Sequence, residues 1–382
     1  MTSEPSAAPE PKLVQLLRPD GVRIGHPDYS LDINDEEIRQ LYRDLVLTRR
    51  IDAEATALQR QGELGLWASC LGQEAAQVGS GRAMRAQDMA FPSYREHGVA
   101  WCAGVDPLAV MSMYRGTSLG GWDPHKYNFA LYTIVIGAQT LHAAGYAMGV
   151  QRDGAVGTGD AERDTAVLAY FGDGASSQGD VSEAFVWAAS DNLPVVLFCQ
   201  NNQWAISAPV ALQARVPLYR RADGFGFTGL RVDGNDVLAC LAVTRAALDH
   251  ARSGQGPTLI EAYTYRMGAH TTSDDPGRYR LAADLEHWQE RDPLARVELY
   301  LRRSTDTAES FFAELDAEAE QLAEYLRAGC RELPDPEPLS AFDTVYVDAP
   351  AELREQRADL ARHLAGLERP GTRPNDVAAD AR

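Results

Sequence analysis

The chain has 382 residues, of which 45% are apolar and 24% charged, and its formal net charge is −19. This composition is ordinary for a soluble globular protein, and the length allows a core that needs no disulfide or metal to hold it together. Such a negative net charge disfavours nucleic acids and anionic membranes as partners, although local positive groups can still bind an anionic ligand.

The five cysteines are odd in number and form no Cys-x-x-Cys pair. They therefore argue against a disulfide framework and a structural zinc site, and they predict a cytoplasmic protein. The N-terminal sequence lacks the basic start and apolar stretch of a secretory signal. The longest apolar runs have the length of strands rather than of membrane spans.

The first half of the sequence is predicted to be mainly helical. Residues 1–33 are rich in Pro, Ser and Ala and predict a flexible arm. From Asp35 to about Gly62, apolar residues recur at helical spacing behind an acidic first turn, which predicts a long helix. Further helices are expected in GQEAAQVGSGRAM, FPSYREHGVAWCAG and AQTLHAAGYAMGVQR, of which the last has small residues suited to packing against a sheet or another subunit.

The middle of the sequence predicts a parallel sheet. The runs TAVLAYFG, LPVVLFCQNN and PTLIEAYTYR are continuously apolar, as is typical of strands that are buried on both faces. Amphipathic segments of helical length separate them, which indicates βαβ units with right-handed crossovers. We therefore expect an α/β fold with a central, mostly parallel sheet flanked by helices.

The domain boundaries follow from composition. Residues 34–335 are expected to form the α/β domain, and a Pro-rich segment then leads into a helical C-terminal extension over residues 336–368. The polar tail, residues 369–382, is expected to be disordered.

Polar residues follow two of the predicted strands. Asp173 lies between two glycines after the first, and Asn202 follows the second. Ligands of open parallel sheets bind at the carboxyl ends of strands, where these two side chains would meet. Their oxygens suit Mg²⁺, which usually shares its coordination shell with phosphate. Gly174, lacking a side chain, would let the backbone approach such a phosphate.

Gly-Asp-Gly alone also occurs in ordinary turns. Joined by a βαβ unit to Asn-Asn, it resembles the thiamine-diphosphate fingerprint of transketolases and 2-oxo acid dehydrogenases. A narrower resemblance covers roughly residues 35–365 and rests on motifs in a fixed order. They are FPSYREHG, GDGASSQGD, QNNQWAIS, RVDGND, YRMGAHTTSDDPGRYR and FDTVYVDAPAELREQRADLARHL. With them the chain resembles α subunits of the thiamine-diphosphate-dependent decarboxylating component of branched-chain 2-oxo acid dehydrogenases.

The resemblance implies a thiamine-diphosphate-binding fold and the cofactors thiamine diphosphate and Mg²⁺. It also implies oxidative decarboxylation of branched-chain 2-oxo acids such as 2-oxoisovalerate. The acyl group would pass to lipoyl groups of an acyltransferase component. The C-terminal motif favours the branched-chain group, because pyruvate-specific α subunits usually end earlier.

The resemblance also implies roles for individual residues. Mg²⁺ would be bound by the side chains of Asp173 and Asn202 and by the backbone carbonyl of Trp204, where the family usually has tyrosine. His270 matches a catalytic histidine that contacts the cofactor phosphate and donates a proton during acyl transfer. The implied cofactor-binding residues are Tyr94, Arg95, Ile136, Gly172, Asp173, Gly174, Ala175, Gln200, Asn202 and His270.

The sequence departs from the family in two places. Gln200 stands where relatives often have arginine and carries no charge, so Arg95 and His270 are expected to contribute more to phosphate binding. Relatives have a Ser-Pro-Leu type turn where this chain has Ile134 and Ile136. A backbone contact from Ile136 to the cofactor is compatible with this sequence, whereas a side-chain contact from Ile134 is not. The sequence does not decide whether the family's potassium site is present.

One part of the catalytic machinery is not found in the sequence. The family activates the cofactor with a glutamate of a separate β subunit, and Glu74 lies far from any motif that would give it this role. We therefore expect a heterotetramer of two α and two β subunits, inactive as the α chain alone. Alternatives are the same chemistry on pyruvate or acetoin, a self-contained transketolase-like transferase, which the short chain disfavours, and a non-catalytic assembly subunit.

Overall fold

The computed structural model describes residues 13–118 and 120–367. The chain divides into two compact units, Met1–Glu332 and Leu333–Arg382. None of the helices in the described ranges is long and apolar enough to cross a membrane. All five cysteines are free.

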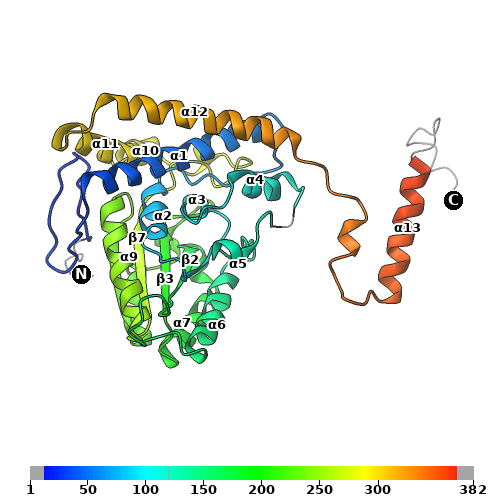
Figure 1. Cartoon of the computed structure of the whole chain (residues 1–382), viewed down its shortest axis with the longest axis horizontal. Helices are drawn as coiled ribbons and strands as arrows, with labels where there is room; N and C mark the ends of the chain where they lie inside the picture. Colours follow the sequence, from blue (N-terminus) through cyan, green and yellow to red (C-terminus); the bar gives the residue numbers. More distant parts are fainter. Residues whose placement is uncertain (1–12, 119, 368–382) are drawn as a thin grey trace, which may run out of the picture. The chain divides into compact units, whose positions relative to one another are not determined.

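The first unit is built on a parallel five-stranded sheet, as the sequence predicts (Figure 1). Its strands occur in the order β1-β2-β3-β7-β6, and every neighbouring pair is parallel. Their bounds are β1 Met89–Phe91, β2 Val167–Gly172, β3 Val195–Asn201, β7 Thr258–Tyr263 and β6 Thr228–Asp233. The mostly parallel α/β fold expected from the apolar runs is therefore confirmed.

The sheet is buried on both faces, which explains why its strands are continuously apolar. In β2, Leu168 and Tyr170 belong to one core, whereas Val167, Ala169 and Phe171 belong to another on the opposite face. Because successive side chains of a strand point to opposite faces, both sets must be apolar when helices cover both sides.

Helices cover the two faces (Figure 1). One face packs against α6 (Ala138–Arg152) and α7 (Gly179–Ser190), and the other against α9 (Val237–Arg252). Beyond α9 lie α2, which packs on it, then α1, and α12, which packs on α1. The bounds of the remaining α-helices of this unit are α1 Asp35–Arg60, α2 Glu74–Gly81, α3 His97–Cys102, α4 Pro107–Arg115, α5 Pro124–Tyr127, α8 Arg221–Phe225, α10 Ala282–Gln289, α11 Pro293–Ser304 and α12 Glu309–Glu332.

The long helix α1 shows how local sequence sets an element's start. Asn34 caps it by accepting a hydrogen bond from the Glu37 N–H, while the Glu37 carboxylate accepts one from the Asn34 N–H. This capping box satisfies two donors that helix formation leaves without partners. The helix ends at Arg60, close to the predicted Gly62.

Residues 13–33 do not form the mobile arm that their composition suggested. Val14 bridges to Val232 of β6, and the N–H groups of Leu16 and Leu17 donate to the Asp236 carboxylate at 2.7 and 2.6 Å. The partner of this segment lies more than two hundred residues away in the sequence, so local composition carries no sign of it. Residues 1–12 lie outside the described residues.

The second unit contains the expected C-terminal helix, α13 (Ala351–Leu367), none of whose residues is buried. The division between the units falls between Glu332 and Leu333, whereas the sequence predicted a boundary after residue 335. The predicted disordered tail, residues 369–382, lies outside the described residues.

Candidate functional site

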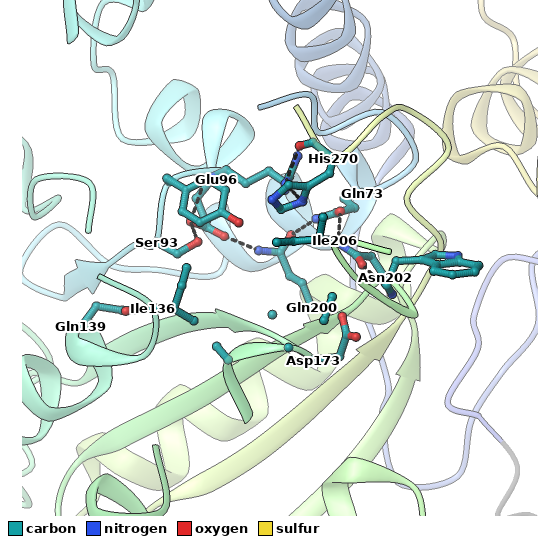
Figure 2. Close-up of a pocket in the computed structure, with 17 residues that line it drawn as sticks. Gln73, Ser93, Glu96, Ile136, Gln139, Asp173, Gln200, Asn202, Ile206 and His270 are labelled. Carbon is teal, nitrogen blue, oxygen red and sulfur yellow. Dashed lines mark hydrogen bonds between the residues drawn. The ribbon is translucent and has the colours of Figure 1, made fainter. Parts of the chain in front are cut away.

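A cavity of about 250 Å³ opens at the carboxyl ends of β2 and β3 (Figure 2). The two strands pair in register, with Gly172 opposite Gln200, so the residues that follow each strand meet at one edge of the sheet. The cavity contains every residue that the sequence assigned to the cofactor or the metal. Its lining is Gln73, Ser93, Tyr94, Arg95, Glu96, Ile136, Gln139, Gly172, Asp173, Gly174, Ala175, Gln200, Asn202, Trp204, Ala205, Ile206 and His270.

Asp173 is a buried carboxylate at the floor of this cavity. Its side-chain oxygen Oδ2 accepts a long hydrogen bond, 3.3 Å, from Nε2 of Gln213. Burial raises the pKa of Asp173 to about 6, and the positive charge of Arg266 opposes this only in part. A buried carboxylate is costly without a compensating charge, so this position favours a cationic ligand.

Two further oxygens belong to residues that line the same cavity as Asp173. Oδ1 of Asn202 accepts a hydrogen bond from the Trp204 N–H at 3.1 Å, and the Trp204 carbonyl accepts one from Arg266 at 3.1 Å. Each oxygen has a second lone pair that remains available to a cation. Carboxylate, amide and backbone oxygens are hard ligands, the kind that Mg²⁺ prefers.

The two glycines that flank Asp173 act differently. A Cβ on Gly172 would meet no atom within 4 Å, and because Gly172 lines the cavity, its missing side chain leaves space for a ligand. A Cβ on Gly174 would lie 2.8 Å from Cβ of Ala205. The need for glycine at position 174 thus comes first from the close approach of the hairpin β4–β5 (Trp204–Ala205 and Ala208–Pro209), in addition to the phosphate approach that the sequence suggested.

Arg95 and His270 form the opposite wall. The Arg95 guanidinium donates to the carbonyl oxygens of Ser69 and His270, and its Nη2 lies 3.2 Å from Nδ1 of His270. Burial, followed by the charges of Arg95 and Arg266, lowers the pKa of His270 to about 4. His270 is therefore neutral at pH 7, and Arg95 and His270 can act as hydrogen-bond donors to an anion.

The structure also adds residues that the sequence analysis missed. Glu96 is buried in the cavity wall, where its carboxylate accepts hydrogen bonds from Gln200 at 2.7 Å and Ser93 at 2.8 Å. Burial raises the pKa of this carboxyl group. Gln73 lies between Gln200 and Asn202 and is hydrogen-bonded to both. The sequence offered one sign of a role for Glu96, which is its position directly after Arg95 in the motif FPSYREHG.

Glu74, the glutamate considered from the sequence, lies outside the cavity lining. It is fully buried and its carboxylate pairs with Arg49 at 2.8 Å, so its role is structural. The mouth of the cavity is apolar instead. The lining residue Ile206 exposes 56% of its surface, and Ile134 and Val135, which precede the lining residue Ile136 in the sequence, expose 61% and 71%.

Comparisons with known proteins agree with this geometry. The model of the family described as dehydrogenase E1 component matches residues 42–327. The chain is 44% identical over 353 residues to the 3-methyl-2-oxobutanoate dehydrogenase subunit alpha of Mycobacterium tuberculosis, covering 92% of this chain and 94% of that protein. It is 35% identical over 350 residues to the pyruvate dehydrogenase E1 component subunit alpha of Staphylococcus aureus, covering 90% and 91%. The corresponding subunit of Staphylococcus epidermidis is 34% identical over the same shares.

Proposed function

Because the chain belongs to the dehydrogenase E1 component family, we propose that it is the α subunit of a branched-chain 2-oxo acid dehydrogenase. Its reaction would be the oxidative decarboxylation of acids such as 3-methyl-2-oxobutanoate, also called 2-oxoisovalerate. The observation that carries this proposal at the site is the single cavity that joins Asp173, Asn202, Arg95 and His270. In it, residues far apart in the sequence offer both cation ligands and anion donors.

Thiamine diphosphate is the cofactor that the family implies, and the cavity fits its diphosphate end. When bound, this cofactor supplies the electron sink that decarboxylation of a 2-oxo acid requires. The side chains of Asp173 and Asn202 and the carbonyl oxygen of Trp204 would hold Mg²⁺ against the diphosphate. Three protein oxygens leave positions for phosphate and water oxygens, which is the usual arrangement for this ion.

The opposite wall would bind the diphosphate directly through protein side chains rather than through a metal ion. Arg95 carries a positive charge, and charge-assisted hydrogen bonds to phosphate are stronger than neutral ones. Gln200 directs one hydrogen of its Nε2 toward Glu96, which leaves the other hydrogen for a ligand oxygen. His270 would contact the phosphate and deliver a proton when the acyl group leaves, a role open to a histidine whose pKa responds to its surroundings.

The cavity mouth supports the proposal of a partner. Exposed apolar side chains that cluster around an active-site entrance mark interaction surfaces more often than isolated ones do. Ile206 lines the cavity, Ile134 and Val135 adjoin the lining residue Ile136 in the sequence, and all three are exposed, so we propose that they form such a surface. A β subunit bound there would cover the cavity and bring the glutamate that activates the cofactor. We propose the α₂β₂ arrangement for this assembly, with a lipoyl-bearing acyltransferase as acceptor of the acyl group.

Pyruvate remains the second candidate substrate, because subunits of pyruvate dehydrogenases are 34% and 35% identical to this chain. The higher identity, 44%, to a subunit of a 3-methyl-2-oxobutanoate dehydrogenase favours the branched acid. Both activities use the same cofactor chemistry, so the difference must lie in how the pocket accepts the substrate side chain.

The experiment that tests the proposal is co-expression with the β subunit. Decarboxylation of 2-oxoisovalerate and of pyruvate would be compared with and without Mg²⁺ and thiamine diphosphate. We expect a higher kcat/KM for 2-oxoisovalerate and dependence on both cofactors. A preference for pyruvate would overturn the substrate assignment. Full activity of the α chain alone would overturn the assembly.

Asp173→Ala is the matching test of the metal site. It should abolish retention of thiamine diphosphate through purification while the fold is kept. Tight retention of the cofactor by this variant would contradict the assignment of Asp173 as a metal ligand. If the chain were instead an assembly subunit without catalytic function, the wild type and Asp173→Ala would assemble equally well with the β subunit. The activity of the assembly would then not depend on thiamine diphosphate or Mg²⁺.

A further inference from the structure

A chain of buried side-chain amides runs along the back wall of the cavity. Nδ2 of Asn202 donates to Oε1 of Gln73 at 2.7 Å, and Nε2 of Gln73 donates to Oε1 of Gln200 at 3.0 Å. Nε2 of Gln200 then donates to Oε1 of Glu96 at 2.7 Å. Every amide in this chain donates in the same direction, toward Glu96 (Figure 2).

The direction in which these amides donate is set at Gln200, which is hydrogen-bonded to Gln77 on one side and to Glu96 on the other. Oε1 of Gln77 accepts from the Gly98 N–H at 2.8 Å, and its Nε2 donates to the Arg95 carbonyl at 2.9 Å, so backbone groups leave this amide only one orientation. The same Nε2 donates to Oε1 of Gln200 at 3.0 Å. The oxygen of Gln200 must therefore face Gln77, and its nitrogen must face Glu96.

The orientation of Gln200 determines that of Gln73. Since Oε1 of Gln200 only accepts, Gln73 must present its NH₂ group to it and its oxygen to Asn202. Asn202 then presents Nδ2 to Gln73, and its Oδ1 accepts from the Trp204 N–H within the cavity that Asp173 also lines. A flipped Asn202 amide would set oxygen against oxygen at Gln73 and N–H against N–H at Trp204.

We propose that Gln73 is a positioning residue that holds the Asn202 amide with its oxygen toward the cation site. This inference rests on the proposed function, because it takes Asn202 as a Mg²⁺ ligand. Gln73 and Gln200 are 1% and 2% exposed, so water cannot readily replace the lost bonds if the chain is broken. Residues that orient metal ligands from behind typically change metal affinity by about 10- to 100-fold when replaced.

Two substitutions of Gln73 separate this role from packing. Gln73→Met has a similar length and removes both hydrogen bonds. Gln73→Glu keeps an oxygen that accepts from Asn202 and loses the donor to Gln200. The control is Gln87→Met, which removes two hydrogen bonds, to Ala161 and Asp164, at the opposite ends of the strands.

The measurement is Mn²⁺ binding, followed by the paramagnetic resonance signal of free Mn²⁺, to the full chain purified with its β subunit in the presence of thiamine diphosphate. We expect Gln73→Met to raise the Kd for Mn²⁺ by about tenfold. Gln73→Glu should stay within about threefold of wild type, since the bond to Asn202 survives. Gln73→Met leaves buried polar atoms of Gln200 and Asn202 without partners, so it should melt at a lower temperature than Gln87→Met, and Mn²⁺ binding is measured at a temperature at which both variants are folded.

The outcomes distinguish the inference from the proposed function. If the wild type binds no Mn²⁺, the metal site and this inference both fail. If the wild type binds Mn²⁺ and both Gln73 variants bind it equally well, only the inference fails. An equal loss in Gln73→Met and Gln73→Glu would also overturn it, because the hydrogen bond to Asn202, which Gln73→Glu keeps, would then not determine the affinity.

Discussion

One guanidinium nitrogen of Arg95, Nη2, contacts His270 at two points: it donates to the His270 carbonyl oxygen at 2.9 Å and lies 3.2 Å from Nδ1 of the same residue. Because a guanidinium has no acceptor, Nδ1 must be the unprotonated nitrogen of the imidazole. The neutral ring therefore carries its proton on Nε2. The contact sets both the tautomer and the position of the histidine.

Replacing Arg95 should weaken cofactor binding. Arg95→Ala removes the positive charge that we propose to face the diphosphate, and it also removes the hydrogen bond to the His270 carbonyl. We expect the Kd for thiamine diphosphate to rise by about 10- to 100-fold, which corresponds to the loss of one or two charge-assisted hydrogen bonds. Arg95→Lys should be intermediate, because lysine keeps the charge and loses the forked geometry.

Quenching of tryptophan fluorescence is a suitable measurement, since Trp204 lines the cavity. Arg278→Ala, a change at an exposed arginine of the neighbouring loop, is the control and should bind as wild type does. Binding by Arg95→Ala that lies within about twofold of wild type would contradict the role of Arg95.

The pKa of His270 should respond to the diphosphate. Without ligand, burial and the charges of Arg95 and Arg266 hold this pKa at about 4, against an opposing contribution from Asp274. A bound diphosphate adds negative charge and stabilises the imidazolium, so the pKa should rise and binding should take up protons. Cofactor affinity should therefore increase as the pH falls through the pKa of the liganded state toward the unliganded value of about 4.

The same residue makes a testable contribution to stability. The folded pKa of about 4 lies below the ordinary value of 6.5, so the unfolded chain binds more protons between these values. The contribution to the free energy of unfolding is present above pH 6.5 and is lost as the pH falls toward 4.

Histidine NMR titration, assigned with His270→Asn, measures the pKa of His270 with and without thiamine diphosphate. Identical values would contradict the proposed contact.

The glycines beside Asp173 should differ when each is changed to alanine. Gly174→Ala places a Cβ against Ala205 and should lower the free energy of unfolding by about 1–3 kcal/mol, as overpacking usually does. Gly172→Ala meets no atom within 4 Å and should fold as wild type does. Its methyl group would occupy cavity space, so it should bind thiamine diphosphate more weakly.

Thermal melting and cofactor titration of both glycine variants test this contrast. If Gly172→Ala bound the cofactor as tightly as wild type, the ligand would not occupy the space beside Gly172. If Gly174→Ala melted as wild type does, the hairpin would not depend on this close approach.

Asp236 should be important for stability although it lies outside the cavity lining. One carboxylate oxygen accepts from the N–H groups of Leu16 and Leu17, and the other accepts from those of Leu238 and Ala239. Asp236→Asn must turn its NH₂ group toward two of these donors whichever way it is placed. We expect it to cost about 2–3 kcal/mol.

The variant should also expose the N-terminal segment, which hydrogen exchange at Leu16 and Leu17 would detect. Asp20→Asn, at an exposed aspartate whose partner Arg18 is also exposed, is the control and should change stability little. Unchanged exchange in Asp236→Asn would show that the apolar contacts of Val14, Leu16 and Leu17 hold the segment without this carboxylate.

The sheet and the meeting of Asp173 and Asn202 at one edge of it were predictable because their signals are local. The apolar runs of β2 and β3 are buried on both faces, so they show no alternation and are recognisable in the sequence. Parallel strands joined by one helix place their carboxyl ends side by side, which brought Asp173 and Asn202 together in the prediction. Position after a strand was enough to identify both residues.

Glu96, Gln73 and the packing of Leu17 were not predictable in the same way. Gln73 contacts Gln200 across 127 positions of sequence, and Leu17 contacts Asp236 across 219. A glutamine or glutamate has no periodicity of its own, and its role depends on which donors and acceptors surround it after folding.

The amino-acid sequence alone determined the parallel α/β sheet, the edge at which the cavity opens and the identity of the charged groups at that edge, because strand burial and chain connectivity dictate them. Only the tertiary structure decided which way the amides of Gln73, Gln200 and Asn202 point and which tautomer His270 adopts. Hydrogen-bond direction depends on the full set of neighbours, and those neighbours come from segments that the sequence keeps apart.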